Sequence, residues 1–279
     1  MSDRILVIGG NGNVGTPLVR ELVRRGEKVR VGSRNPTAPA NGVETVRLDL
    51  TDPATFVAAF DGVDRAYVLA PTGNADVGGL LTPVLDAAIE RGGKVVLQTA
   101  MGVDADDNIP FRQLELKLER ASTPYVILRP NWFTDNLRTY WARDISEGVI
   151  RVPAGESKTS FIDARDIAAS AAAALTETRF DRRAFDLTGP EALSYANVAD
   201  LLAKATGRDI AYRSADDELF VSRRIADGFQ EPYARLLAAI FHPVREGWAA
   251  KVTDAVKTLT GAEPRTVAAY VRENAAAFS

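Results

Sequence analysis

The amino-acid sequence predicts an α/β fold in which a doubly wound parallel sheet carries a smaller, mostly helical C-terminal lobe. Three observations lead to this prediction. Short apolar runs alternate with helical patterns six times within residues 1–130, which is typical of parallel strands joined by right-handed helical crossovers. The alternation ends after Pro130, where longer helical patterns begin. A cluster of glycines directly follows the first apolar run, and such a turn marks the ligand-binding edge of this fold class.

The composition is that of a globular protein and excludes several kinds of site. The chain has 279 residues, of which 46% are hydrophobic and 25% charged, so it can bury a sizeable core. It has no cysteine and a single histidine, His242, which excludes disulfides, thiolate nucleophiles and Fe–S clusters, and we expect no metal site. No G-x-S-x-G motif accompanies His242, so we expect this residue to be structural and predict no serine hydrolase triad.

Charge and hydropathy indicate which partners to expect. The net charge of −3, with no block of like charge, gives no general attraction for nucleic acid or an anionic membrane. The apolar run near the N-terminus is too short for a signal sequence, and no stretch approaches the roughly 20 residues of a membrane span. We therefore expect a cytoplasmic protein with neither nucleic acid nor membrane as a partner, and we leave a homodimer open.

Residues 1–130 are predicted to form the sheet domain. The run Ile5–Ile8 is continuously apolar, as in a strand buried on both faces, and Leu18 and Leu22 then share a helical stripe. The pair Asp52-Pro53 is a strong helix start because the aspartate can cap and the proline suits the first turn. The expected strands are 5–8, 28–31, 43–48, 65–70, 94–99 and 125–128, with a loop between Pro36 and Gly42. One helix is expected to begin near residue 14 and another near residue 52. A third is expected to end near residue 91, and a fourth to cover 111–121.

Residues 131–279 are predicted to form a smaller substrate-binding lobe that is interleaved with late sheet strands. The aromatic-rich segment 131–145 is expected to be helical, and a long alanine-rich helix is expected after residues 160–167. The run 184–187 is expected to be a further strand. Ser194 is expected to cap a helix that ends at Gly207, and residues 216–278 are expected to be mainly helical.

The glycine turn predicts a dinucleotide site. Gly10, Gly12 and Gly15 form G-x-G-x-x-G, while Gly9, Gly12 and Gly15 form G-x-x-G-x-x-G, and both registers fit. In either register Gly12 lets the backbone approach a pyrophosphate, and Gly15 lets the following helix pack on the strand. The helix N-terminus adds N–H groups and a positive dipole end for the anion. The predicted cofactor contacts of the turn are Gly9, Gly10, Asn11, Gly12, Asn13 and Val14.

The ends of the following strands indicate which nucleotide binds. NAD sites place a carboxylate after the second strand, whereas this chain has Ser33 and Arg34 there. Arg34 can pair with a 2′-phosphate and Ser33 can add a hydroxyl donor, so we predict NADP(H), unless Arg34 is only a solvated loop charge. Asp49 and Leu50 can hold the adenine, although Asp49 can equally cap a turn. The residues predicted beside the nicotinamide ribose end the fourth strand and are Leu69, Ala70 and Pro71.

Several of these segments together resemble those of a known family. The resemblance is to the NmrA-like branch of atypical short-chain dehydrogenases/reductases, and within it to NADPH:quinone oxidoreductases and azoreductase-like proteins. It is carried by the turn from Gly9 to Gly15, by Ser33-Arg34-Asn35-Pro36, by Asp49-Leu50, and by residues 125–133 followed by Asn136-Leu137. The resemblance extends over nearly the whole chain. It implies a Rossmann domain, NADP(H), and a substrate cleft between the sheet edge and the C-terminal lobe.

The resemblance also implies candidate catalytic residues. The wider superfamily uses Tyr-x-x-x-Lys on a helix, where the phenol donates a proton and the lysine holds the nicotinamide ribose. The matching helix here offers Gln113 and Lys117, so the tyrosine is missing, and the serine that usually ends the fifth strand is matched by Thr99. Lys117 and Thr99 are therefore the expected catalytic residues, with Lys117 also binding the cofactor, unless Lys117 is only a surface charge on an amphipathic helix.

The missing tyrosine favours an acceptor that needs no strong general acid during hydride transfer, such as a quinone. We therefore predict an NADPH-dependent oxidoreductase that transfers hydride to a quinone-like or other conjugated small-molecule acceptor. Asn131, Trp132 and Phe133 follow the sixth strand and are predicted to bind a flat aromatic substrate, although such aromatic residues are often core residues instead. An NADP(H)-binding redox sensor without turnover is the alternative function. The missing tyrosine favours this sensor, whereas the long, aromatic-rich C-terminal lobe, which can enclose a small substrate, favours the enzyme. A reductase of imines or enones is a third interpretation.

Overall fold

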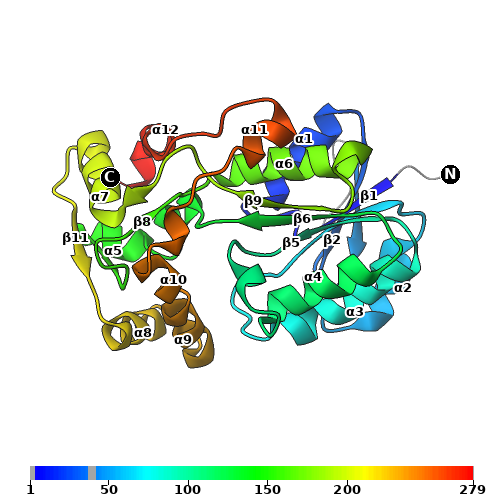
Figure 1. Ribbon diagram of the computed structural model, residues 1–279, viewed down its shortest axis with the longest axis horizontal. Coiled ribbons are helices and arrows are strands. Elements are labelled where there is room, and N and C mark those ends of the chain that lie inside the picture. Colours follow the sequence, from blue (N-terminus) through cyan, green and yellow to red (C-terminus); the bar gives the residue numbers. More distant parts are fainter. Residues whose placement is uncertain (1–3, 37–41, 279) are drawn as a thin grey trace.

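The computed structural model describes residues 4–36 and 42–278, and within these residues a seven-stranded parallel sheet forms the centre of the molecule (Figure 1). Its strand order is β3-β2-β1-β4-β5-β6-β9. This is the 3-2-1-4-5-6 order of a doubly wound sheet with one strand added, so the predicted fold class is confirmed. The loop predicted between Pro36 and Gly42 lies mostly outside the described residues. The strands are β1 (Arg4–Ile8), β2 (Lys28–Ser33), β3 (Val43–Arg47), β4 (Arg65–Leu69), β5 (Lys94–Gln98), β6 (Tyr125–Pro130) and β9 (Arg183–Leu187).

Helices cover both faces of the sheet and enclose two apolar cores (Figure 1). Because successive strand residues point to opposite faces, Ile5 and Val7 lie in one core, and Leu6 and Ile8 lie in the other. One face carries α1 (Gly15–Arg24), α6 (Ala164–Thr176) and α11 (Ala255–Thr260). The other carries α2 (Phe56–Phe60), α3 (Val77–Glu90) and α4 (Pro110–Arg120). Short 3-10 turns in this part are η1 (Pro53–Thr55), η2 (Val103–Ala105) and η4 (Thr178–Phe180).

The C-terminal lobe has a third core of its own. Its helix α7 (Tyr195–Thr206) has the predicted ends, because Ser194 forms a capping box with Asn197 and Gly207 adopts a left-handed φ of 71°. The other lobe helices are α5 (Ala142–Ser146), α8 (Asp217–Ala226), α9 (Glu231–Ala239), α10 (His242–Arg245) and α12 (Val267–Glu273). The 3-10 turns of the lobe are η3 (Thr134–Arg138), η5 (Trp248–Ala250) and η6 (Ala275–Ala277). Its strand pairs are β7 (Val149–Val152) with β11 (Ala211–Ser214), and β8 (Lys158–Thr159) with β10 (Leu193–Ser194).

The chain passes between the two parts more than once. Helix α6 and strand β9 belong to the second half of the sequence, yet both complete the main sheet domain (Figure 1). The boundary at residue 130 stays a prediction. Across residues 4–36 and 42–278, none of the helices combines the length and the apolar character that a bilayer crossing requires.

The segment 131–145 differs from the single helix that the sequence predicts. After β6, Phe133 forms a parallel bridge with Ile162, and the chain then makes two short elements, η3 and α5. Trp141 at the start of α5 is buried and contacts Tyr195 edge-on, with 5.3 Å between ring centroids. Contacts with the rest of the lobe therefore decide the path of this segment, and they override its local helical pattern.

Candidate active site

The glycine turn lies at the carboxyl end of β1, where the strand order changes direction between β1 and β4. Gly12 donates its N–H to the Gly9 carbonyl at 3.0 Å, and Gly9 has a φ of 73°. A Cβ at Gly15 would lie 2.1 Å from the Gly9 oxygen, and one at Gly10 would lie 2.7 Å from Cγ1 of Val31. Packing therefore requires glycine at positions 10 and 15. A Cβ at Gly12 would meet nothing nearer than 3.4 Å, so its missing side chain leaves space above the turn for a ligand.

Helix α1 presents an open N-terminus beside this turn. Val14 occupies the N-cap position, and among the described residues no side chain forms a capping hydrogen bond there. The N–H of Thr16 reaches the Gly12 carbonyl at 2.9 Å, so the helix continues directly from the glycine turn. Uncapped N–H groups and the helix dipole together attract an anion. The turn and helix thus fit the pyrophosphate of a dinucleotide.

The ends of β2 and β3 bring three predicted cofactor residues together. Leu48 donates its N–H to the Ser33 carbonyl at 2.9 Å, which places Ser33 beside Asp49. The Asp49 Oδ1 accepts from the N–H and the hydroxyl of Thr51 at 3.0 and 2.8 Å. These bonds lower the pKa of Asp49, and the positive charge of exposed Arg34 lowers it further. Asp49 therefore caps a turn, which is one of its two predicted roles, and its contact with adenine stays a prediction.

The end of β4 lies against the glycine turn. A Cβ at Gly9 would meet Cδ2 of Leu69 at 3.0 Å, so the two predicted cofactor segments are neighbours. Leu69 and Ala70 are half-buried, and Pro71 is exposed. The structure thus brings together the predicted pyrophosphate and nicotinamide-ribose contacts at one sheet edge.

A buried ionic cluster occupies the ends of β5 and β6. Thr99 donates its hydroxyl hydrogen to Oε1 of Glu115 at 2.6 Å, and Glu115 is fully buried. Arg129 donates to both oxygens of Glu115, at 2.9 and 2.7 Å, and Arg112 adds a third arginine contact at 3.0 Å. Arg129 also pairs with Asp104 at 2.5 Å. The single hydroxyl hydrogen of Thr99 is committed to Glu115, so Thr99 can accept a hydrogen bond from a ligand but can donate one only after this bond breaks.

Lys117 and Thr99, the two predicted catalytic residues, are not brought together. Lys117 Nζ lies 2.5 Å from the carboxylate of Asp86 in α3. Since Lys117 and Glu115 are two positions apart on α4, they point toward nearly opposite sides of the helix, and Thr99 contacts Glu115. Gln113, which replaces the superfamily tyrosine, is exposed and donates to the Asp107 carbonyl. The binding of Lys117 to the ribose stays a prediction.

The predicted substrate residues lead from β6 into the lobe. The side-chain nitrogen of Asn131 donates to the Ser160 hydroxyl and to the Ala249 carbonyl, each at 2.8 Å, so both amide hydrogens have partners within the protein. Trp132 is half-buried and packs on the aromatic core of the lobe. Phe133 is also half-buried and packs against a core of the main sheet. Their contact with a substrate stays a prediction.

Tyr140 and Tyr233 form a contact that the sequence patterns do not predict. The hydroxyls of Tyr140 and Tyr233 lie 2.7 Å apart, and the Thr72 side chain also interacts with the Tyr140 hydroxyl. Thr72 belongs to the loop that leaves the carboxyl end of β4. No motif spacing connects the two tyrosines, which are 93 positions apart, so the sequence carries no signal for this contact.

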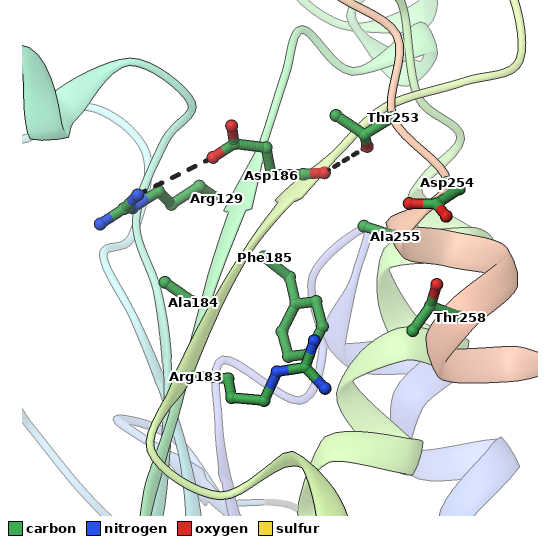
Figure 2. Close-up of a pocket in the computed structure, with 9 residues that line it drawn as sticks. All are labelled: Arg129, Arg183, Ala184, Phe185, Asp186, Thr253, Asp254, Ala255 and Thr258. Atoms are coloured by element: carbon green, nitrogen blue, oxygen red, sulfur yellow. Dashed lines mark hydrogen bonds and ion pairs between the residues drawn. The ribbon is translucent and has the colours of Figure 1, made fainter.

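A hollow of about 260 Å³ lies beside β9 and α11. Figure 2 shows the side chains that line it. Arg129 of β6 is among its lining residues and lies 3.9 Å from Asp186, whose carbonyl accepts the Thr253 hydroxyl at 2.6 Å. Strands β4, β5 and β6 separate β9 from β1, so this hollow is not part of the glycine-turn site.

Residues 4–36 and 42–278 contain no group of three or more His, Asp or Glu side chains that could hold a metal ion. The His242 side chain is 58% exposed and contacts Trp248 edge-on, with 5.7 Å between ring centroids.

The sheet order, the glycine turn and the open helix end define a Rossmann-type dinucleotide-binding protein. The model of the NmrA-like family matches residues 1–271, and this chain belongs to that family.

Individual relatives match along almost their whole length. The chain is 33% identical over 274 residues to an uncharacterised oxidoreductase of Bacillus subtilis, covering 98% of this chain and 95% of the relative. It is 32% identical over 285 residues to an NAD(P)H azoreductase of Xenophilus azovorans, covering 98% of this chain and 99% of the relative. Among solved structures, the NADPH-dependent quinone oxidoreductase of Escherichia coli complexed with NADPH has the same fold, with a TM-score of 0.84 at 21% identity over 96% of this chain and 99% of that chain.

Proposed function

We propose that this protein is an NADPH-dependent oxidoreductase that transfers hydride to a quinone-like or other conjugated small-molecule acceptor. The proposal rests mainly on the close contact between the glycine turn and the end of β4. It is supported by Arg34, which follows β2 in place of an acidic residue. The 32% identity to an NAD(P)H azoreductase supports the same class of reaction. The fold shared with a quinone oxidoreductase complexed with NADPH supports the placement of the cofactor.

The residues at this edge fit NADPH by their chemistry. Gly12 and the N-terminus of α1 would hold the pyrophosphate, and Arg34 with Ser33 would hold the 2′-phosphate. When bound, NADPH supplies a hydride from its nicotinamide ring. Further contacts are proposed for adenine from Asp49 and Leu50, and for the nicotinamide ribose from Leu69, Ala70, Pro71 and Lys117.

The proposed enzyme is an atypical member of its superfamily because it lacks the tyrosine of Tyr-x-x-x-Lys. Exposed Gln113 stands in that position, and an amide is not an acid of useful strength. A conjugated acceptor suits such a site, since the negative charge that forms on it is delocalised. Trp132 and Phe133 would provide the flat wall for this acceptor, and Thr99 would offer a hydrogen-bond acceptor beside it.

The direct test is NADPH oxidation by the purified protein with a panel of quinones, enones and imines. We expect acceptor-dependent loss of the nicotinamide absorbance with at least one conjugated acceptor and a slower loss with NADH. Tight NADPH binding with no turnover of any acceptor would refute the enzyme assignment and support an NADP(H)-binding redox sensor instead.

A further inference from the structure

Two phenols and a threonine meet where the C-terminal lobe contacts the sheet domain. Tyr140 lies between η3 and α5, Tyr233 lies on α9, and their hydroxyl oxygens are 2.7 Å apart. The third member, Thr72, interacts with the Tyr140 hydroxyl. It directly follows Leu69–Pro71, the residues that we place at the nicotinamide ribose. Thr72 therefore connects the phenol pair with the segment of the sheet edge where hydride transfer is proposed.

The surrounding side chains hold the Tyr140 ring in place. Phe229 stacks on Tyr140 at 5.6 Å between centroids and on Tyr233 at 6.0 Å. Arg224 donates to the backbone carbonyl of Tyr140, and the same fully buried guanidinium pairs with Asp144 at 2.9 Å. The ring and backbone of Tyr140 are thus fixed, while its hydroxyl end points toward the other two hydroxyls.

The pair has a hydrogen available for a third group. Burial is the main reason that the pKa of Tyr140 is raised, the neighbouring Tyr233 raises it further and the Thr72 side chain lowers it, so the Tyr140 phenol keeps its hydrogen near neutral pH and releases it less readily than a free tyrosine. Each phenol carries one hydrogen and can also accept one. One hydrogen bridges the pair, and the other can be directed outward. By contrast, the Thr99 hydrogen is committed to Glu115.

We propose that Tyr140, with Tyr233 behind it, delivers the proton that the missing superfamily tyrosine would otherwise supply. This inference rests on the proposed function. The acceptor gains two electrons with the hydride and becomes an oxyanion. The O–H bond of Tyr140 then breaks as a new O–H bond forms on that oxyanion. Tyr233 passes its hydrogen to Tyr140, and water returns a proton to Tyr233, so one NADPH and one proton are consumed for each acceptor reduced.

Tyr140→Phe tests this assignment because it keeps the ring and its stack on Phe229 while it removes the hydroxyl. We expect kcat with a quinone to fall at least about tenfold, the solvent deuterium isotope effect on kcat to change, and NADP⁺ affinity to stay as in the wild type. The affinity for 4-nitrophenolate, a redox-inert analogue of the oxyanion, should fall about tenfold as well. Tyr233→Phe should lower kcat by a smaller factor.

Tyr212→Phe is the matched control. It removes another lobe hydroxyl, which bonds the Gly155 carbonyl at 2.8 Å, and it should change none of these readouts. The assignment would be overturned if the wild type is active and both the kcat and the 4-nitrophenolate affinity of Tyr140→Phe lie within twofold of the wild-type values. If Tyr140→Phe does not fold, kcat and 4-nitrophenolate affinity are compared between Tyr233→Phe and the wild type instead, and unchanged values would overturn the assignment.

Failure of the proposed function is distinguishable from failure of this inference. A wild type that turns over no acceptor refutes the proposed function, and 4-nitrophenolate binding then still reports on the phenols. Equal 4-nitrophenolate affinity in the wild type and in Tyr140→Phe would overturn the phenol pair as an oxyanion site, and a tenfold difference would support it.

Discussion

Alanine at two glycines of one turn should separate the packing of the turn from its contact with the cofactor. In Gly15→Ala the new methyl group would lie 2.1 Å from the Gly9 oxygen and 2.6 Å from the Gly10 Cα. Both are backbone atoms, so no side-chain rotation can relieve the contact and the turn must shift. Overpacking of this kind costs about 1–3 kcal/mol, of which the better helix propensity of alanine offsets up to about 1 kcal/mol. We expect both the free energy of unfolding and the NADPH affinity to fall.

Gly12→Ala should behave differently. Its methyl group would meet nothing nearer than 3.4 Å, and Gly12 is not among the glycines with positive φ, so the free energy of unfolding should stay within about 0.5 kcal/mol of the wild type. The methyl group would occupy the space proposed for the pyrophosphate, so NADPH affinity should fall at least about tenfold. Urea unfolding and fluorescence titration with NADPH measure the two quantities. Wild-type NADPH affinity in Gly12→Ala, or wild-type stability in Gly15→Ala, would refute the reasoning.

Three further predictions concern charged side chains. Arg34→Ala should weaken NADPH binding about ten- to a hundredfold in titrations and leave NADH binding unchanged, whereas equal losses would contradict the 2′-phosphate contact. Arg129→Met removes the two-pronged partner of fully buried Glu115 and should cost about 3 kcal/mol in urea unfolding, whereas Arg235→Met, which breaks the exposed pair with Glu231, should cost far less; similar losses would refute the distinction. Hydrogen bonding to Arg24 lowers the pKa of Glu21 from 4.5 to about 2, so the stability from this pair is complete above pH 4.5 and is lost as the pH falls toward 2. Glu21→Gln should therefore be less stable than the wild type near neutral pH. A stability difference that persists unchanged as the pH falls from 4.5 toward 2 would contradict the expected direction of the pH dependence.

Much of the fold follows from local patterns that the sequence displays. The run Ile5–Ile8 is buried on both faces, and a strand of this kind needs apolar residues at every position. Ser194 and Gly207 satisfy the backbone groups at the two ends of α7, so these ends are visible in the sequence. The turn at Gly15 is equally readable because the Gly9 oxygen leaves no room for a side chain.

The remaining features depend on contacts between distant parts of the chain. Residues 131–145 have helical spacing, but the bridge from Phe133 to Ile162 and the burial of Trp141 impose a different path. The ion pair of Lys117 with Asp86 joins two helices, and nothing in the spacing of either helix indicates it. The hydroxyl contact between Tyr140 and Tyr233 arises only when α9 lies beside the segment between η3 and α5, 93 positions earlier in the chain.

A single-turnover measurement tests the central claim most directly. The protein is loaded with one equivalent of NADPH and mixed with an excess of a quinone, and the nicotinamide absorbance is followed in time. We predict a rapid loss of this absorbance, which the same concentrations of NADPH and quinone do not show without protein. Absorbance that persists while NADPH remains bound, with every conjugated acceptor tried, would contradict hydride transfer by this protein.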